Sequence, residues 1–167
     1  MPAHASKRPI GLAMAVLVGA VLVGLAASGT ALAAVDAAKV EHDRLENYKK
    51  IGGAFKTVND QLKADKPDTG AIAAQAHIIH DLAPQIPSWF PAGSGPEAGI
   101  KTRAKPEIWT DKATFASAAK GLETESAKLE TIARGGDLDA IKGQFKATGG
   151  ACKTCHDKFR GPELKHD

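Results

Sequence analysis

Cysteine and methionine are both scarce in this chain of 167 residues. The only two cysteines, Cys152 and Cys155, lie three positions apart, so no framework of disulfides is available to stabilise the fold. The only two methionines, Met1 and Met14, lie near the amino terminus, so a chain that loses this segment has no thioether ligand for a metal. Alternation of apolar and polar residues is also missing, which argues against a β-sheet.

The charges are nearly balanced, with 22 lysines and arginines against 19 aspartates and glutamates. Loss of the first 33 residues would remove Lys7 and Arg8, leaving 20 basic residues and a formal charge of about +1. Nucleic-acid-binding domains usually carry a concentrated positive charge. The composition therefore predicts no nucleic-acid partner.

The amino terminus has the three parts of a secretory signal peptide. A basic pair precedes an apolar run over residues 10–27, and an Ala-Leu-Ala sequence at positions 31–33 fits the small-x-small cleavage rule. The alternative is an uncleaved membrane anchor, because 18 apolar residues lie at the lower limit for a span. Four glycines between positions 11 and 29 favour cleavage. We therefore expect residues 1–33 to be removed on export to the periplasm, leaving one domain over residues 34–167 that is not membrane-bound.

The most specific motif is Cys152-Lys153-Thr154-Cys155-His156, a single C-x-x-C-H. This is the attachment motif of a c-type haem, in which two thiols bond to the porphyrin vinyl groups and the histidine offers its imidazole to the iron. On a helix, residues three and four apart share a face, so all three side chains would reach the same flat ligand. The motif predicts one covalently attached haem c, with His156 as the iron ligand.

Three other interpretations of the two cysteines are weaker. A thioredoxin-like redox pair would follow a strand, but the preceding apolar residues have helical spacing. A zinc site would need a fourth ligand, for which only His166 lies nearby. A disulfide between positions three apart would close a very small loop and restrict the unfolded chain little.

Four amphipathic helices are predicted from apolar residues that recur every three to five positions. The first covers about residues 35–63, and the second begins after Asp68 and ends before Pro84. The third has Pro106 in its first turn and ends at a glycine pair, and the fourth follows the cap Asp137 and carries the haem motif. Residues 84–105 contain four prolines and three glycines and are predicted to form a long loop.

This order of elements predicts an all-α protein, an antiparallel up-down-up-down four-helix bundle with the haem bound among the helices near the carboxyl terminus. Gly149 and Gly150, one turn before the motif, either allow a close approach to the backbone or break the helix. His77 and His80 are weak as a metal pair and are expected at the surface or its boundary.

The sequence resembles cytochrome c prime, class II of the c-type cytochromes. The resemblance spans essentially the whole chain after the signal, and the motif near the carboxyl terminus is its most specific element, since class I cytochromes carry theirs near the amino terminus. The stretches that carry it are Arg44 to Gly52, Arg103 to Trp109, the turn Gly136-Asp137, and Gly150 to Arg160.

The resemblance implies that His156 leaves the iron five-coordinate and that Tyr48, from the first helix, covers the opposite face of the haem. It also implies that Arg44 lies near the propionates. The family often has glutamine directly after that arginine, where this chain has Leu45. Without the resemblance, an arginine on a helix is most often a solvated charge, and a tyrosine at this spacing is most often core. The further cofactor contacts implied are Leu45, Arg103 and Arg160.

The absence of methionine bears on the iron's sixth position. Low-spin members of class II use a first-helix methionine there and carry electrons, and this chain has none after the signal. Five-coordinate haem is therefore expected. The alternative is a histidine ligand, for which the candidates are His42, His77, His80 and His166.

Two functions follow from the resemblance. The first is binding of small diatomic gases, NO or CO, in NO defence or buffering, and the second is electron transfer to an unknown periplasmic redox partner. A haem enzyme has little support, because no distal histidine and arginine arrangement for peroxide cleavage is visible. The resemblance also implies a homodimer through the first two helices, where the small residues Ala71, Ala73 and Ala74 lie.

Overall fold

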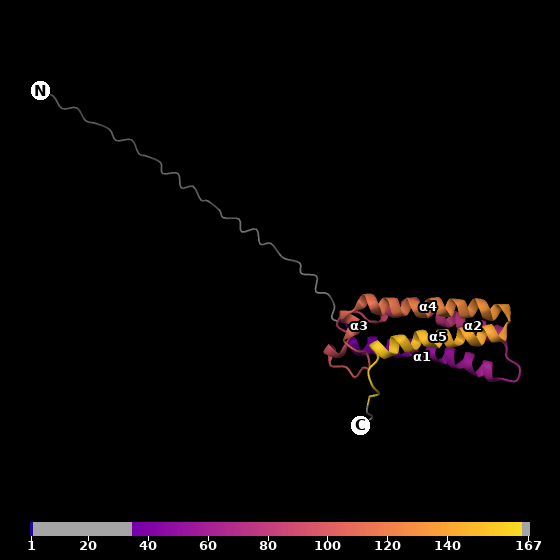
Figure 1. Cartoon of the computed structure of the whole chain (residues 1–167). Coiled ribbons are helices and arrows are strands. Elements are labelled where there is room, and N and C mark those ends of the chain that lie inside the picture. Colours follow the sequence, from indigo (N-terminus) through magenta and orange to yellow (C-terminus); the bar gives the residue numbers. More distant parts are fainter. Residues whose placement is uncertain (2–34, 165–167) are drawn as a thin grey trace. The chain divides into compact units, whose positions relative to one another are not determined.

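The computed structural model describes Met1 and residues 35–164, so apart from Met1 the predicted signal peptide lies outside the described residues. Within residues 35–164, four long helices run side by side as the predicted bundle (Figure 1). They are α1 (Ala37–Lys63), α2 (Thr69–Leu82), α4 (Lys112–Gly135) and α5 (Leu138–Phe159). Shorter elements join α2 to α4: the 3₁₀ helices η1 (Ala83–Trp89) and η2 (Pro96–Ala98), and α3 (Glu107–Thr110).

An aspartate side chain begins each of the four long helices, because its carboxylate accepts a hydrogen bond from a free amide of the first turn. Asp36 accepts from the Lys39 amide at 3.0 Å, and Asp68 accepts from the Ala71 amide at 2.9 Å. Asp137 accepts from two amides at the start of α5. The caps predicted at Asp68 and Asp137 are thus confirmed.

The prediction of one continuous third helix is wrong, because the chain leaves the helical conformation at Asp111. This residue leaves the helical conformation, with φ −122° and ψ 56°, and its side chain caps α4 by accepting from the Thr114 amide at 3.3 Å. The same carboxylate pairs with Lys158 of α5 at 2.7 Å. Local capping and a partner distant in sequence outweigh the continuous apolar pattern, so the expected helix becomes α3 and α4.

The buried side chains form two clusters along the bundle. One contains residues from all four long helices, including Ile51, Ile79, Phe115 and Phe159. The other lies toward the α4–α5 turn and is built on Val58, Ile72, Leu129 and Ile141. Each fully buried aliphatic side chain contributes about 1.5–3 kcal/mol relative to its exposed state. Contact is extensive around the bundle except between α1 and α5, which touch only sparsely.

Gly149 and Gly150 do not break a helix, because α5 is continuous through both. A Cβ on Gly149 would lie 3.2 Å from Cζ of Phe55 on α1, so this glycine allows a close approach of the two helices. A Cβ on Gly150 would meet nothing within 4 Å. The position is exposed, and nothing in its surroundings explains a glycine there.

Gly150→Ala is expected to stabilise the protein by about 0.5–1 kcal/mol, because alanine loses less conformational entropy in a helix interior than glycine does. Thermal unfolding of the haem-loaded protein should show a rise of a few degrees. Gly149→Ala is the matched control, since its Cβ presses on Phe55 and the gain should shrink or reverse. A loss of stability in Gly150→Ala would contradict this account.

Two further observations concern membrane spanning and the pairing of chains. Among the described residues, no helix is long and apolar enough to cross a membrane. Ala73 is buried in the core of the bundle, so it is not part of an exposed face available for pairing.

Candidate functional site

A cavity of about 610 Å³ lies between α1 and α5, which touch only sparsely. Its volume is within the range of small-molecule and cofactor sites. α1 and α5 supply most of its lining, α4 supplies an apolar side, and the segment 101–104 lies at its edge. All eight cofactor-binding residues predicted from the sequence line this one cavity: Arg44, Leu45, Tyr48, Arg103, Cys152, Cys155, His156 and Arg160.

Cys152 and Cys155 lie one turn apart on α5 as half-buried free thiols that pack against the apolar core. Burial raises the pKa of the Cys152 thiol, and burial together with the neighbouring Cys152 raises the pKa of Cys155 to about 11. Both side chains are therefore neutral in the cavity at ordinary pH. They are not joined by a disulfide in this structure.

His156 follows directly and is also half-buried in the cavity lining. Burial lowers its pKa, and the positive charges of Arg160 and Arg103 lower it further. The imidazole is thus biased toward its neutral form, which is the form that ligates a metal. Arg160 and Arg103 therefore lie close enough to His156 for their charges to act on its imidazole.

Tyr48 and Leu45 line the cavity from α1, on the other side from the cysteines. The Tyr48 ring packs edge-on against Trp89, with ring centroids 5.2 Å apart. Burial raises the pKa of the Tyr48 phenol, and the nearby Cys155 adds to the effect, so the hydroxyl stays protonated. Leu45 is 49% exposed and contributes an apolar edge.

Arg44 is buried, with only 3% of its surface exposed. Its guanidinium donates to the Trp89 carbonyl at 3.1 Å, to the Ser94 carbonyl at 3.1 Å and to the Ser94 hydroxyl at 2.9 Å. It also pairs with Glu41 and lies 4.1 Å from the centre of the Phe90 ring. The Arg44 side chain therefore anchors α1 to the end of η1 and to the loop that follows, in addition to lining the cavity.

The long loop is held against the end of α5 by backbone hydrogen bonds. The Lys105 amide donates to the Phe159 carbonyl at 3.0 Å, and the Gly161 amide donates to the Arg103 carbonyl at 2.7 Å. The Arg103 side chain returns a bond to the Gly161 carbonyl at 3.1 Å. These bonds fix Arg103 and Arg160 beside the cavity, although the two residues are far apart in sequence.

The residues of the cavity fit a haem of the c type. Two neutral thiols and a neutral imidazole line an apolar space from one helix, and Arg103 and Arg160 are in the same lining, where carboxylates of a ligand could pair with them. Cys152 and Cys155 would hold the porphyrin covalently and His156 would hold the iron. The lining also includes residues that the sequence did not single out as cofactor contacts, chiefly Ile86, Lys101, Thr102 and Leu164.

Comparison with known proteins gives one consistent result. Residues 39–160 match the family model described as Cytochrome C'. A cytochrome c' from Rubrivivax gelatinosus is 44% identical over 110 residues, which cover 66% of this chain and 84% of that protein.

Solved structures agree with the fold. Cytochrome c' from Thermochromatium tepidum superposes with a TM-score of 0.70 at 24% identity, covering 78% of this chain and all of the other. A nitric oxide complex of a cytochrome c prime variant from Alcaligenes xylosoxidans gives a TM-score of 0.66 at 26% identity, covering 75% of this chain and 97% of that one. The resemblance inferred from the sequence and the predicted bundle are therefore confirmed.

Proposed function

The chain belongs to the cytochrome c' family, and we propose that it is a monohaem cytochrome with five-coordinate haem c that binds NO or CO. When bound, the haem supplies an iron atom with a coordination position open to a diatomic molecule. The protein's part is to hold the cofactor, to leave that position without a side-chain ligand, and to control access to it.

The observation that carries the proposal is the composition of the cavity lining. Among the described residues, His156 is the one histidine that lines the cavity, and His42, His77 and His80 are not part of it. His166 lies outside the described residues. With no methionine beyond the amino-terminal segment, the α1 side of the cavity offers the Tyr48 ring in place of a strong iron ligand.

The chemistry of this lining favours neutral ligands. The α1 and α4 sides are built from apolar and aromatic side chains such as Tyr48, Ile51, Phe115 and Leu122. An anion next to these four side chains would lose its hydration without a charged partner among them, whereas a neutral diatomic loses little. The nitric oxide complex of the Alcaligenes xylosoxidans relative supports NO as one such ligand.

The spin state of the iron tests the proposal. Ferric haem-loaded protein at neutral pH is expected to give a high-spin electron paramagnetic resonance signal, and the ferrous protein should bind one equivalent of NO or CO. The variants His42→Gln, His77→Gln and His80→Gln should leave the signal unchanged, because these residues lie outside the cavity lining.

A fully low-spin spectrum would contradict the proposal. If replacement of one of these histidines then restored a high-spin signal, the cavity would have rearranged to bind that histidine. A fixed six-coordinate iron would favour the electron-transfer shuttle, because such a centre reorganises little when its charge changes.

The compartment and assembly belong to the same proposal. Covalent haem attachment takes place outside the cytoplasmic membrane, and the predicted signal at residues 1–33 would export the chain to the periplasm. Pairing of two copies through α1 and α2 stays a prediction, without Ala73 because that residue is buried.

A further inference from the structure

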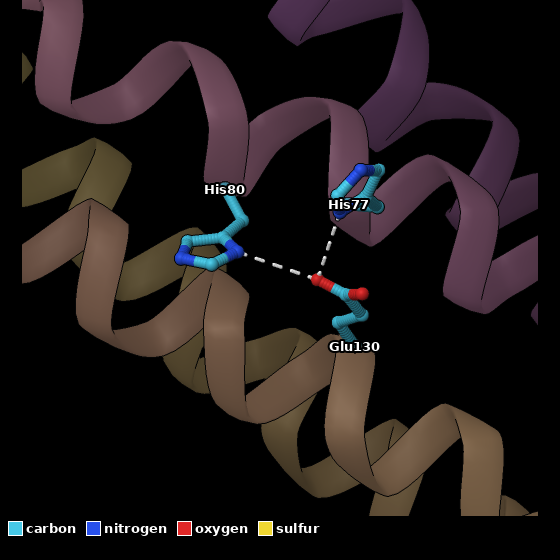
Figure 2. Close-up of side chains that lie close together, drawn as sticks. All are labelled: His77, His80 and Glu130. Atoms are coloured by element: carbon cyan, nitrogen blue, oxygen red, sulfur yellow. Dashed lines mark hydrogen bonds and ion pairs between the residues drawn. The ribbon is translucent and has the colours of Figure 1, made fainter.

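A second group of metal-ligating side chains lies between α2 and α4. His77 and His80 are three positions apart near the end of α2, and Glu130 faces them from α4 (Figure 2). Nδ1 of each histidine lies 3.3 Å from the same oxygen, Oε2 of Glu130. One ligand atom from each of the three residues lies within 4.8 Å of the other two.

Glu130 is the buried member of this group, since only 8% of its surface is exposed. Its other oxygen, Oε1, pairs with Arg134 one turn further along α4. The side chain is therefore ionised, with Oε2 directed at the two imidazoles.

Asp81 sets the orientation of the first histidine. Nε2 of His77 lies 3.1 Å from a carboxylate oxygen of Asp81, one turn further along α2. When the ring is neutral and its Nε2 hydrogen points to Asp81, the lone pair at Nδ1 faces the Glu130 carboxylate. Two acceptors facing each other require a cation between them, either a proton or a metal ion. A carboxylate behind a metal-binding histidine is a common arrangement in metal sites.

We propose that His77, His80 and Glu130 bind a divalent transition-metal ion of the Zn²⁺ class, with water completing the coordination. Two imidazoles and one carboxylate form a known zinc ligand set that leaves a position for water. Ligands about 2.0–2.1 Å from a tetrahedral ion lie roughly 3.3 Å from one another, which is the spacing found here between each Nδ1 and Oε2. Imidazole nitrogen disfavours Ca²⁺ and Mg²⁺, which prefer oxygen.

The bound ion would connect α2 to α4 at a site separate from the haem cavity, since none of the three ligands lines that cavity. His77 and His80 are partly exposed, with 52% and 37% of their side-chain surfaces accessible, so an ion can reach them without opening the bundle. Because only the folded chain brings α2 and α4 together, the ion would also stabilise the fold by mass action.

Calorimetric titration of Zn²⁺ into chelator-treated, haem-loaded protein tests the proposal. Wild-type protein should take up one ion per chain and unfold at a higher temperature in its presence. His80→Gln should weaken binding about tenfold or more, and Glu130→Gln should do the same. His42→Gln, an exposed histidine of α1, is the matched control and should bind as wild type does.

Two results would overturn the proposal. One is no saturable uptake by wild-type protein at about 100 µM Zn²⁺. The other is unchanged uptake in the double variant His77→Gln with His80→Gln, since ions held elsewhere, including at the cysteines, would persist there. Glu130→Gln could also disturb the buried pair with Arg134. The partly exposed His80 therefore provides the decisive single variant, and its haem spectrum should match wild type.

Discussion

A variant in which Cys152 and Cys155 are both alanine is expected to release all its haem into acid acetone, whereas the wild-type protein keeps it. Both thiols line the cavity on the same face of α5, beside His156, so both can add to the vinyl groups of one porphyrin. Without these thioether bonds, only the imidazole and apolar packing hold the cofactor, and acid removes both. Extraction followed by absorbance of each phase measures the effect.

The exposed residue Lys153, between the two cysteines, provides the control. Lys153→Ala removes only a surface ion pair with Asp157 and should retain the haem completely. Haem that is extractable from the wild-type protein would show that the motif does not attach it. Any fraction of the double variant that lacks haem should also lose helical structure by circular dichroism, because its cavity of about 610 Å³ with an apolar lining would be left unfilled.

Capping residues explain why the limits of the helices could be predicted. Asp68 and Asp137 satisfy first-turn amides with their own side chains, and Gly136 ends α4 with a positive φ of 78°. These are local interactions that a sequence displays directly. The break at Asp111 was missed because one of its causes is Lys158 of α5, which is distant in sequence.

The same difference between local and distant interactions decides which residues of the candidate site could be predicted. The six residues on α1 and α5 could be predicted from helical spacing, the haem motif and the family resemblance, and they line the cavity together with Arg103 and Arg160. Ile86 and Thr102 could not, because no periodic pattern of apolar residues marks their segments. The segment of Thr102 is held by hydrogen bonds to the distant end of α5, such as that from the Gly161 amide to the Arg103 carbonyl. Glu130 was missed for a similar reason, since its partners lie 50 or more residues earlier.

The second large effect is expected at Tyr48. Its ring lies on the α1 side of the cavity, across from the haem-attachment residues of α5, and is held by edge-on packing against Trp89 at 5.2 Å. If the haem lies between α1 and α5 as proposed, a diatomic ligand would bind on that side only when the ring moves away. Its affinity would then be multiplied by the fraction of time that the ring is displaced. An aromatic pair of this kind contributes about 0.5–1.5 kcal/mol.

Tyr48→Ala is therefore expected to raise the CO affinity of the ferrous protein about two- to tenfold, because about 1.4 kcal/mol corresponds to a tenfold change. The CO association rate, measured by flash photolysis, should rise with it. Tyr48→Phe is the matched control: it keeps the ring and its packing against Trp89, so it should bind CO nearly as wild type does. Unchanged CO binding in Tyr48→Ala would make Tyr48 an ordinary core residue. If Tyr48→Phe matched Tyr48→Ala instead, the hydroxyl rather than the bulk of the ring would control access.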